Sequence, residues 1–175
     1  PYKWSQPNWE GLWTSVFSDE DYSRFLGTII LLNEEEEGDK KTFIFDGQQR
    51  ITTLTILIKA AIEEVFEKGY EGTAGEMSGW VLRLPSGQPR LTVSENIKDY
   101  FEEQIQGAPG NSPSQGNSKY EKEIFKAYKF FKSECKKYLE NKCNSNGDEF
   151  WKKIKKRLNE IELVELSIKD MVLGI

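Results

Sequence analysis

Residues 46–54, DGQQRITTL, constrain the fold of this chain more than any other segment. A β-branched and aromatic run at residues 41–45 leads directly into them. After them, apolar residues recur at helical spacings: Ile51, Leu54, Ile58, Ile62 and Val65. The first pattern favours a strand and the second favours an amphipathic helix. Gly47 and Arg50 therefore lie where a predicted strand turns into a predicted helix.

Such a junction has the chemistry of an anion site. The first backbone N–H groups of a helix have no intrahelical acceptors, and the helix dipole favours negative charge at the same end. Gly47 would let an anion approach the backbone closely, and Arg50 could bind a phosphate bidentately. The segment therefore predicts a site for a nucleotide phosphate.

A plain capped helix is the competing interpretation. With Asp46 as the N-cap, Gln49 is the third helical residue, and the two fit a capping box in which each side chain satisfies a free N–H group. A capping box does not need Gly47, which weakens a helix start, nor Gln48 and Arg50. Local chemistry alone leaves both interpretations open.

Composition narrows the class of protein. The chain has 175 residues, 37% of them hydrophobic, which is enough for the core of one domain. Histidine is absent, so Ser-His-Asp and Cys-His catalysis and histidine metal sites are excluded from this segment. No stretch approaches the roughly 20 apolar residues of a membrane span, and Cys135 and Cys143 form no CxxC pair. We expect a cytoplasmic protein without a membrane anchor.

The charge pattern argues against DNA binding by this segment itself. The net charge is −5, and the one dense basic cluster, residues 152–157, interrupts an apolar face that includes Trp151, Ile154 and Leu158. A DNA-binding surface needs a basic stripe. We expect the cluster to be the solvated face of an amphipathic helix.

The remaining patterns predict an α+β fold, with a small mixed sheet and several packed helices. We expect these elements in chain order: a helix capped by Ser5, strands at residues 24–32 and 41–45 around an acidic turn at 34–39, the signature helix ending at Gly69, a hairpin of residues 80–84 and 90–93, a short helix capped by Ser94, two long helices from about residue 119 to 158, and a strand at 164–168. Residues 71–79 are glycine-rich, so we expect a loose connection there. Residues 107–118 lack an apolar period, so we expect a flexible insertion loop.

The signature, extended back to Phe45, resembles that of the N-terminal domain of GmrSD-type modification-dependent (type IV) restriction enzymes. That domain of unknown function is similar to the ParB and sulfiredoxin superfamily. Other segments resemble further family motifs: Tyr2-Lys3-Trp4, Phe25-Leu26-Gly27, Arg90-Leu91-Thr92 and Asp99-Tyr100-Phe101. The resemblance implies a single domain over residues 1–175 with a ParB/sulfiredoxin-like sheet. Because the family's opening motif begins with Gln-Arg before Tyr2, and because the chain closes on an apolar run, we expect truncation at both ends.

The resemblance also implies a function. It suggests a regulatory NTPase domain of a phage-defence DNA restriction system, which binds and hydrolyses a nucleoside triphosphate (NTP) while a nuclease domain or subunit cleaves DNA. DNA would be bound by other parts of the full-length protein. The alternative is a ParB-like domain that senses a nucleotide or a DNA phosphate without hydrolysis. Sulfiredoxin chemistry is excluded, since the motif cysteine is replaced by Gln48.

The resemblance assigns roles to individual residues. Phosphate contacts fall to Gly47, Arg50, Thr52, Tyr2 and Lys3. Catalytic roles fall to Asp46, Gln48 and Gln49, with Asp46 contacting Mg²⁺ directly or through water and a glutamine orienting the attacking water.

Overall fold

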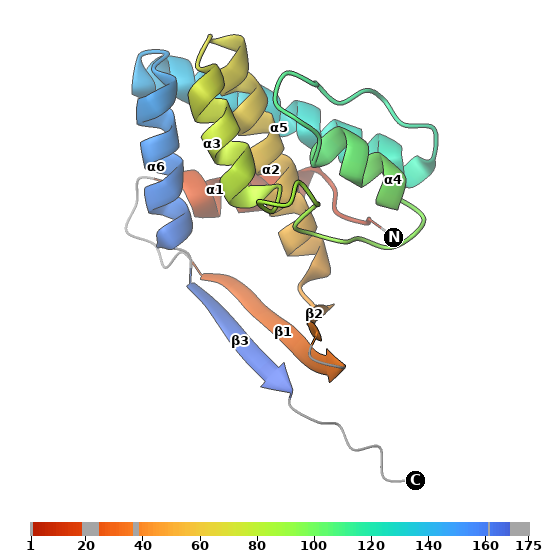
Figure 1. Cartoon of the computed structure of the whole chain (residues 1–175). Helices are drawn as coiled ribbons and strands as arrows, with labels where there is room; N and C mark the ends of the chain where they lie inside the picture. The colour runs from red at the N-terminus through yellow and green to blue at the C-terminus, as the bar shows by residue number, and fades with distance from the viewer. Residues whose placement is uncertain (1, 19–24, 37–38, 161, 169–175) are drawn as a thin grey trace, which may run out of the picture.

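Two strands follow the first helix, a run of helices comes next, and a third strand ends the described part of the chain (Figure 1). The computed structural model describes residues 2–18, 25–36, 39–160 and 162–168. In chain order the elements are α1 (Gln6–Phe17), β1 (Phe25–Glu36), β2 (Asp39–Asp46), α2 (Gln48–Glu67), α3 (Glu71–Val81), α4 (Lys98–Tyr100), the π-helical turn η1 (Phe101–Ile105), α5 (Lys119–Cys143), α6 (Gly147–Asn159) and β3 (Glu162–Ile168). The predicted α+β fold is confirmed.

The three strands form one mixed sheet in the order β2-β1-β3. β1 pairs antiparallel with β2 and parallel with β3, which confirms the predicted pairing and the predicted mixed character. The predicted boundaries were too short, because β1 continues to Glu36 and β2 begins at Asp39. Most of the predicted acidic turn is therefore strand, and residues 37–38 lie outside the described part of the chain. Figure 1 shows the sheet at one end of the helical body, with β2 running into α2.

Helix α2 is the centre of the helical body. It contacts α5, α3 and η1, and the helix is buried around almost its whole circumference from Thr52 to Val65, except at Leu54. The helix ends as predicted, with Lys68 as the C-cap and Gly69 at a φ of +87°, a backbone conformation that favours glycine. A helix buried on all sides in this way has its direction and position fixed by the core.

A charged pair lies inside this core. Lys59 and Glu63 are 0% and 1% exposed, and Lys59 Nζ lies 2.7 Å from Glu63 Oε1. The same ammonium group donates to the carbonyls of Gly107 and Ala108, at 3.3 and 3.0 Å. Residues 107–118 contain no helix or strand, but they are tethered to α2 by these bonds. The flexibility of this loop stays a prediction.

Helix α3 corrects two predictions. The glycine-rich residues 71–79 form a helix rather than a loose connection, and the hairpin expected after them is reduced to one isolated bridge between Arg83 and Pro89. Packing against α2 and α6, through Ala74 and Met77, overrides the low helix propensity of glycine. Ser94 does not cap the next helix, since α4 begins at Lys98 with Ile97 as its N-cap.

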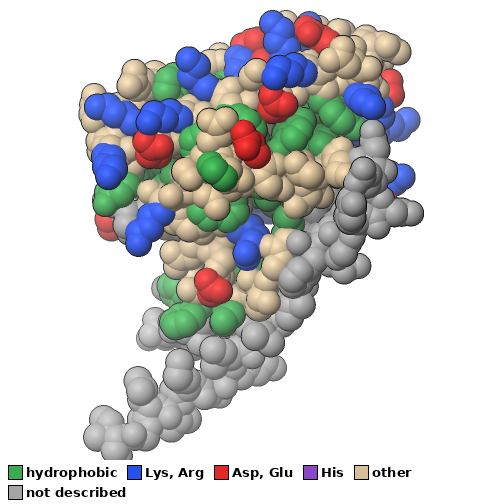
Figure 2. All heavy atoms as spheres, turned by 180° about the vertical axis from the view of Figure 1, so that it is seen from behind, with side chains coloured by type: hydrophobic (Ala, Val, Ile, Leu, Met, Phe, Trp, Pro, Cys, Tyr) green, Lys and Arg blue, Asp and Glu red, His purple; other side chains and the backbone are tan. Residues whose placement is uncertain are grey.

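Helices α5 and α6 agree with the predictions. α5 buries an apolar stripe that includes Ile124, Phe131 and Cys135, and its N-cap Ser118 forms a capping box with Glu121. The basic residues of α6 lie on its solvated face, where Lys153, Lys155 and Arg157 pair with carboxylates. Figure 2 shows Lys and Arg side chains spread among Asp and Glu over one face of the helical body. None of the helices that the structure describes is long and apolar enough to cross a membrane.

Candidate functional site

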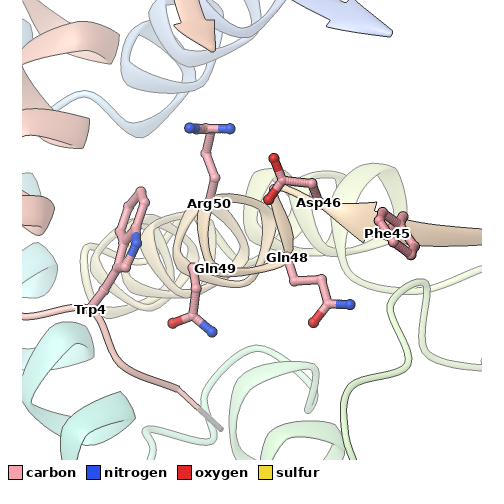
Figure 3. Close-up of a pocket in the computed structure, with 7 residues that line it drawn as sticks. Trp4, Phe45, Asp46, Gln48, Gln49 and Arg50 are labelled. Carbon is pink, nitrogen blue, oxygen red and sulfur yellow. The ribbon is translucent and has the colours of Figure 1, made fainter. Parts of the chain in front are cut away.

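The junction of β2 and α2 forms an open pocket of about 290 Å³. Its lining consists of Trp4, Phe45, Asp46, Gly47, Gln48, Gln49 and Arg50. Figure 3 shows how the polar side chains spread around the first turn of α2: Asp46 and Arg50 project to one side and Gln48 and Gln49 to the other, with Trp4 and Phe45 at opposite flanks. The signature therefore surrounds the N-terminus of the central helix.

Gly47 is the N-cap of α2 for two structural reasons. Its φ of +90° lies in the left-handed region, which costs glycine little. A Cβ at this position would also lie 3.0 Å from Ile29 Cγ1 and 3.5 Å from the Thr28 carbonyl oxygen of β1. The competing interpretation, a capping box with Asp46 as the N-cap, is therefore wrong: Asp46 is the last residue of β2, and Gly47 is the N-cap.

The two glutamines of the signature connect α2 to other segments. Gln48 Nε2 donates to the Ile44 carbonyl of β2 at 2.7 Å. Gln49 Oε1 accepts from the backbone N–H of Lys3, also at 2.7 Å. Both side-chain amides thus fix the start of α2, one to β2 and the other to the opening segment. The signature alone did not indicate this structural role.

Arg50 is turned toward β1. Its Nη1 donates to the Thr28 carbonyl at 3.0 Å, and its guanidinium group lies over Gly27. The Thr28 carbonyl occupies one N–H donor of a group that has several. The arginine is therefore held in place by the sheet while other donors can serve a ligand.

The opening segment contributes Trp4 to the pocket but not Tyr2. Tyr2 is 3% exposed, its hydroxyl lies 2.9 Å from Thr53 Oγ1, and it accepts from Trp9 Nε1 at 3.0 Å. Burial raises the pKa of Tyr2 to about 12. Tyr2 is therefore part of the core between α1 and α2.

The pocket thus unites some of the predicted site residues and leaves out others. Asp46, Gly47, Gln48, Gln49 and Arg50 line it, whereas Tyr2, Lys3 and Thr52 do not. Thr52 is buried in α2, and the side chain of Lys3 is exposed beside the pocket residue Trp4. Phe45, which the sequence analysis did not assign to the site, is 66% exposed. Its position directly before the signature was the available signal.

Asp46 is the carboxylate of this pocket, and it is exposed. Within the described ranges, no group of three or more His, Cys, Asp or Glu residues is arranged to hold a metal ion. Mg²⁺ commonly uses one or two protein carboxylates, with phosphate oxygens and water as its other ligands. An exposed carboxylate such as that of Asp46 fits this kind of Mg²⁺ site.

The fold and the pocket define an α+β domain with an open pocket where a strand turns into a buried helix. The chain matches the family model "GmrSD restriction endonuclease, N-terminal domain" over residues 1–172, and it belongs to this family. The resemblance seen in the signature is thereby confirmed. Comparison with curated proteins and with solved structures gives no match.

Proposed function

We propose that this chain is a regulatory domain of a phage-defence DNA restriction system, and that it binds and hydrolyses an NTP at the β2–α2 junction. The restriction role rests on the family. The nucleotide role rests on one observation: the signature surrounds the N-terminus of a buried 20-residue helix, in a pocket that aromatic side chains flank.

The phosphates bind at the first turn of α2. The helix dipole favours negative charge there, and Gly47 leaves the backbone accessible. Arg50 donates to a phosphate oxygen with the N–H groups that do not contact Thr28. Lys3, whose side chain is exposed next to the pocket, supplies further positive charge.

Asp46 requires a cation when phosphate is bound, because two negative groups repel each other. Mg²⁺ held by Asp46, directly or through water, neutralises charge on the phosphate oxygens when it is bound. The exposed position of Asp46 at the pocket supports this role.

The flanking aromatic residues favour a nucleotide over free phosphate. Trp4 and Phe45 lie at opposite sides of the pocket, and Phe45 exposes 66% of its surface. An aromatic ring beside a phosphate site offers a stacking surface for a nucleobase.

DNA contact by other parts of the protein agrees with the charge distribution. On α6, Lys153, Lys155 and Arg157 are paired with the carboxylates of Glu149, Glu76 and Glu160. The net charge of −5 adds no general attraction to DNA phosphates. A nuclease domain or subunit elsewhere would therefore bind and cleave the DNA.

A sensor that does not hydrolyse its nucleotide is the second candidate function. It is favoured by the structural bonds of Gln48 Nε2 and Gln49 Oε1, because a glutamine fixed to the backbone is less free to orient water. In the hydrolytic function, the Gln48 Oε1 atom would accept from the attacking water. Phosphate release compared with NTP binding distinguishes the two functions.

Arg50→Ala tests the site. Loss of a charge-assisted hydrogen bond to phosphate removes about 1.5–3 kcal/mol, so the Kd measured by calorimetry with Mg²⁺-NTP should rise about 10- to 150-fold. Arg90→Ala is the matched control, since Arg90 Nη2 also donates to a backbone carbonyl, that of Gly79, at 3.0 Å. Both variants should melt within a few degrees of the wild type. An Arg50→Ala protein that unfolds, or that binds NTP normally, would show that the signature is only structural.

A further inference from the structure

We infer that Gly27 of β1 is a positioning residue for the nucleotide site, because its missing side chain leaves the space in which the Arg50 guanidinium lies. The inference rests on the proposed function and deepens it. It gives the strand beneath α2 a part in phosphate recognition.

The contact between Gly27 and Arg50 is close. A Cβ at Gly27 would lie 2.8 Å from Arg50 Nη2, 3.0 Å from Cζ and 3.3 Å from Nη1. These three nearest atoms all belong to the guanidinium group. Any side chain at position 27 would therefore displace that group from its present place.

The backbone around Gly27 is shaped for this contact. Gly27 has a φ of +96°, and the pairing of β1 with β3 shifts register between Phe25 and Thr28. Such irregularities re-aim the groups that follow them, and they occur often beside functional sites. Here the next carbonyl, that of Thr28, accepts from Arg50 Nη1 at 3.0 Å.

The same short stretch of β1 also supports the start of α2. The position of a Cβ on Gly47 would lie 3.5 Å from the Thr28 carbonyl oxygen and 3.5 Å from Ile29 Cα. Residues 27–29 therefore contact both the N-cap of α2 and the guanidinium group of Arg50. This fixes the arginine relative to the helix end at which the phosphates would bind.

A substitution at Gly27 should damage the site more than the fold. The atoms that a new Cβ meets are the far end of a flexible side chain, which can move away without a shift of the backbone. The remaining cost is that of an alanine with positive φ, which any left-handed glycine position would share. Ligand affinity and stability should therefore respond differently.

The test compares Gly27→Ala with Gly69→Ala. Gly69 has a similar φ of +87°, but a Cβ there would meet no atom within 4 Å, so this variant carries the backbone cost alone. Binding of ATP, GTP, CTP and UTP, each with Mg²⁺, is measured by calorimetry, and melting temperatures are measured in parallel. We expect Gly27→Ala to weaken the tightest-binding triphosphate at least about tenfold. Gly69→Ala should stay within about twofold of the wild type, with a similar loss of melting temperature.

A double-mutant cycle shows whether Gly27 acts through Arg50. In an Arg50→Ala background, where no guanidinium group remains to be displaced, Gly27→Ala should have no further effect on Kd. If the wild type binds one of the triphosphates and Gly27→Ala binds it equally well, or if the two substitutions act additively, the inference alone is wrong. If the wild type binds none of them, the proposed function is wrong and the inference falls with it.

Discussion

The hydroxyl group of Tyr2 provides a sharp test of how the opening segment is used. The structure places it in the core, where it bridges Thr53 of α2 and Trp9 of α1. Because this hydroxyl is buried and hydrogen-bonded, Tyr2→Phe should lower the stability of the protein and leave NTP binding unchanged. If Tyr2 instead contacted phosphate, the same change would weaken binding with little effect on stability.

The expected loss of stability follows from the groups left behind. Trp9 is 5% exposed, and its Nε1–H loses its acceptor in Tyr2→Phe, which costs about 1–3 kcal/mol. Thr53 Oγ1 keeps its bond to the Gln49 carbonyl at 2.7 Å, so its lost contact with Tyr2 adds little to the loss of stability. At about 2–4 °C per kcal/mol for a domain of this size, the melting temperature should fall by roughly 2–12 °C.

The difference in stability between the wild type and Tyr2→Phe should depend on pH in a defined direction. Burial raises the pKa of Tyr2 from 10.0 to about 12, so the unfolded chain ionises first as the pH rises. The stability that the neutral hydroxyl contributes is complete below pH 10 and is lost progressively between pH 10 and about 12. Two pKa units correspond to at most about 2.7 kcal/mol of stability. The free energies of unfolding of the wild type and of Tyr2→Phe should therefore converge as the pH rises through this range.

Urea unfolding followed by tryptophan fluorescence at pH 8, 10 and 11 measures this difference. Tyr120→Phe is a suitable control, because it removes a hydroxyl from a half-buried tyrosine elsewhere, on α5. Tyr100, whose pKa is also raised to about 12 by burial, is present in every variant and cancels from the comparison. Equal stability of wild type and Tyr2→Phe at pH 8 would refute the core placement, and so would loss of NTP affinity at unchanged stability.

Three other experiments test the core, the loop and the metal role of Asp46. Lys59→Met should lower the free energy of unfolding measured in urea by about 3–5 kcal/mol, because Glu63 is left as an unpaired buried charge. A double variant that also replaces Glu63 with Leu should recover most of this stability. A double variant as unstable as Lys59→Met would contradict the argument. Thermolysin should cut the chain first within residues 107–118, as peptide mass mapping would show. The cut should be faster in Lys59→Met, because this variant loses the bonds that tether the loop to α2. Protection of this loop equal to that of α2 would contradict the prediction. Asp46→Ala should melt within a few degrees of the wild type, since Gly47 is the N-cap. The variant should lose the part of the NTP affinity that depends on Mg²⁺, which calorimetry with and without Mg²⁺ measures. An unchanged Mg²⁺ dependence would show that Asp46 does not hold the metal.

The sequence predicted the elements whose signals are local and strong. The apolar period after Arg50 located α2, and the β-branched run before Asp46 located β2. The junction between them, and hence the position of the pocket, followed from those two periodicities. The family resemblance pointed to the opening segment but assigned Tyr2 and Lys3 to the site, whereas the residue of that segment that lines the pocket is Trp4.

The features that the sequence did not predict depend on tertiary contacts. Residues 71–79 contain three glycines, and their helix forms because Ala74 and Met77 are buried against neighbouring helices. The capping box at Asp46 matched the local pattern, but β1 lies close enough beneath Gly47 to decide the N-cap. Lys59 is a charged residue in the buried part of α2, and its partners at residues 107–108 come from a segment with no periodicity.

The structural and the functional interpretations of the signature are compatible. Gln48 binds a carbonyl of β2, Gln49 binds the opening segment and Arg50 binds a carbonyl of β1. These bonds hold three separate segments around one helix end, and they fix the helix end in return. A site that binds an anion without rearrangement needs such fixed donors, because ordering them during binding would cost affinity. The bonds that make the signature structural would therefore also prepare it to hold a phosphate.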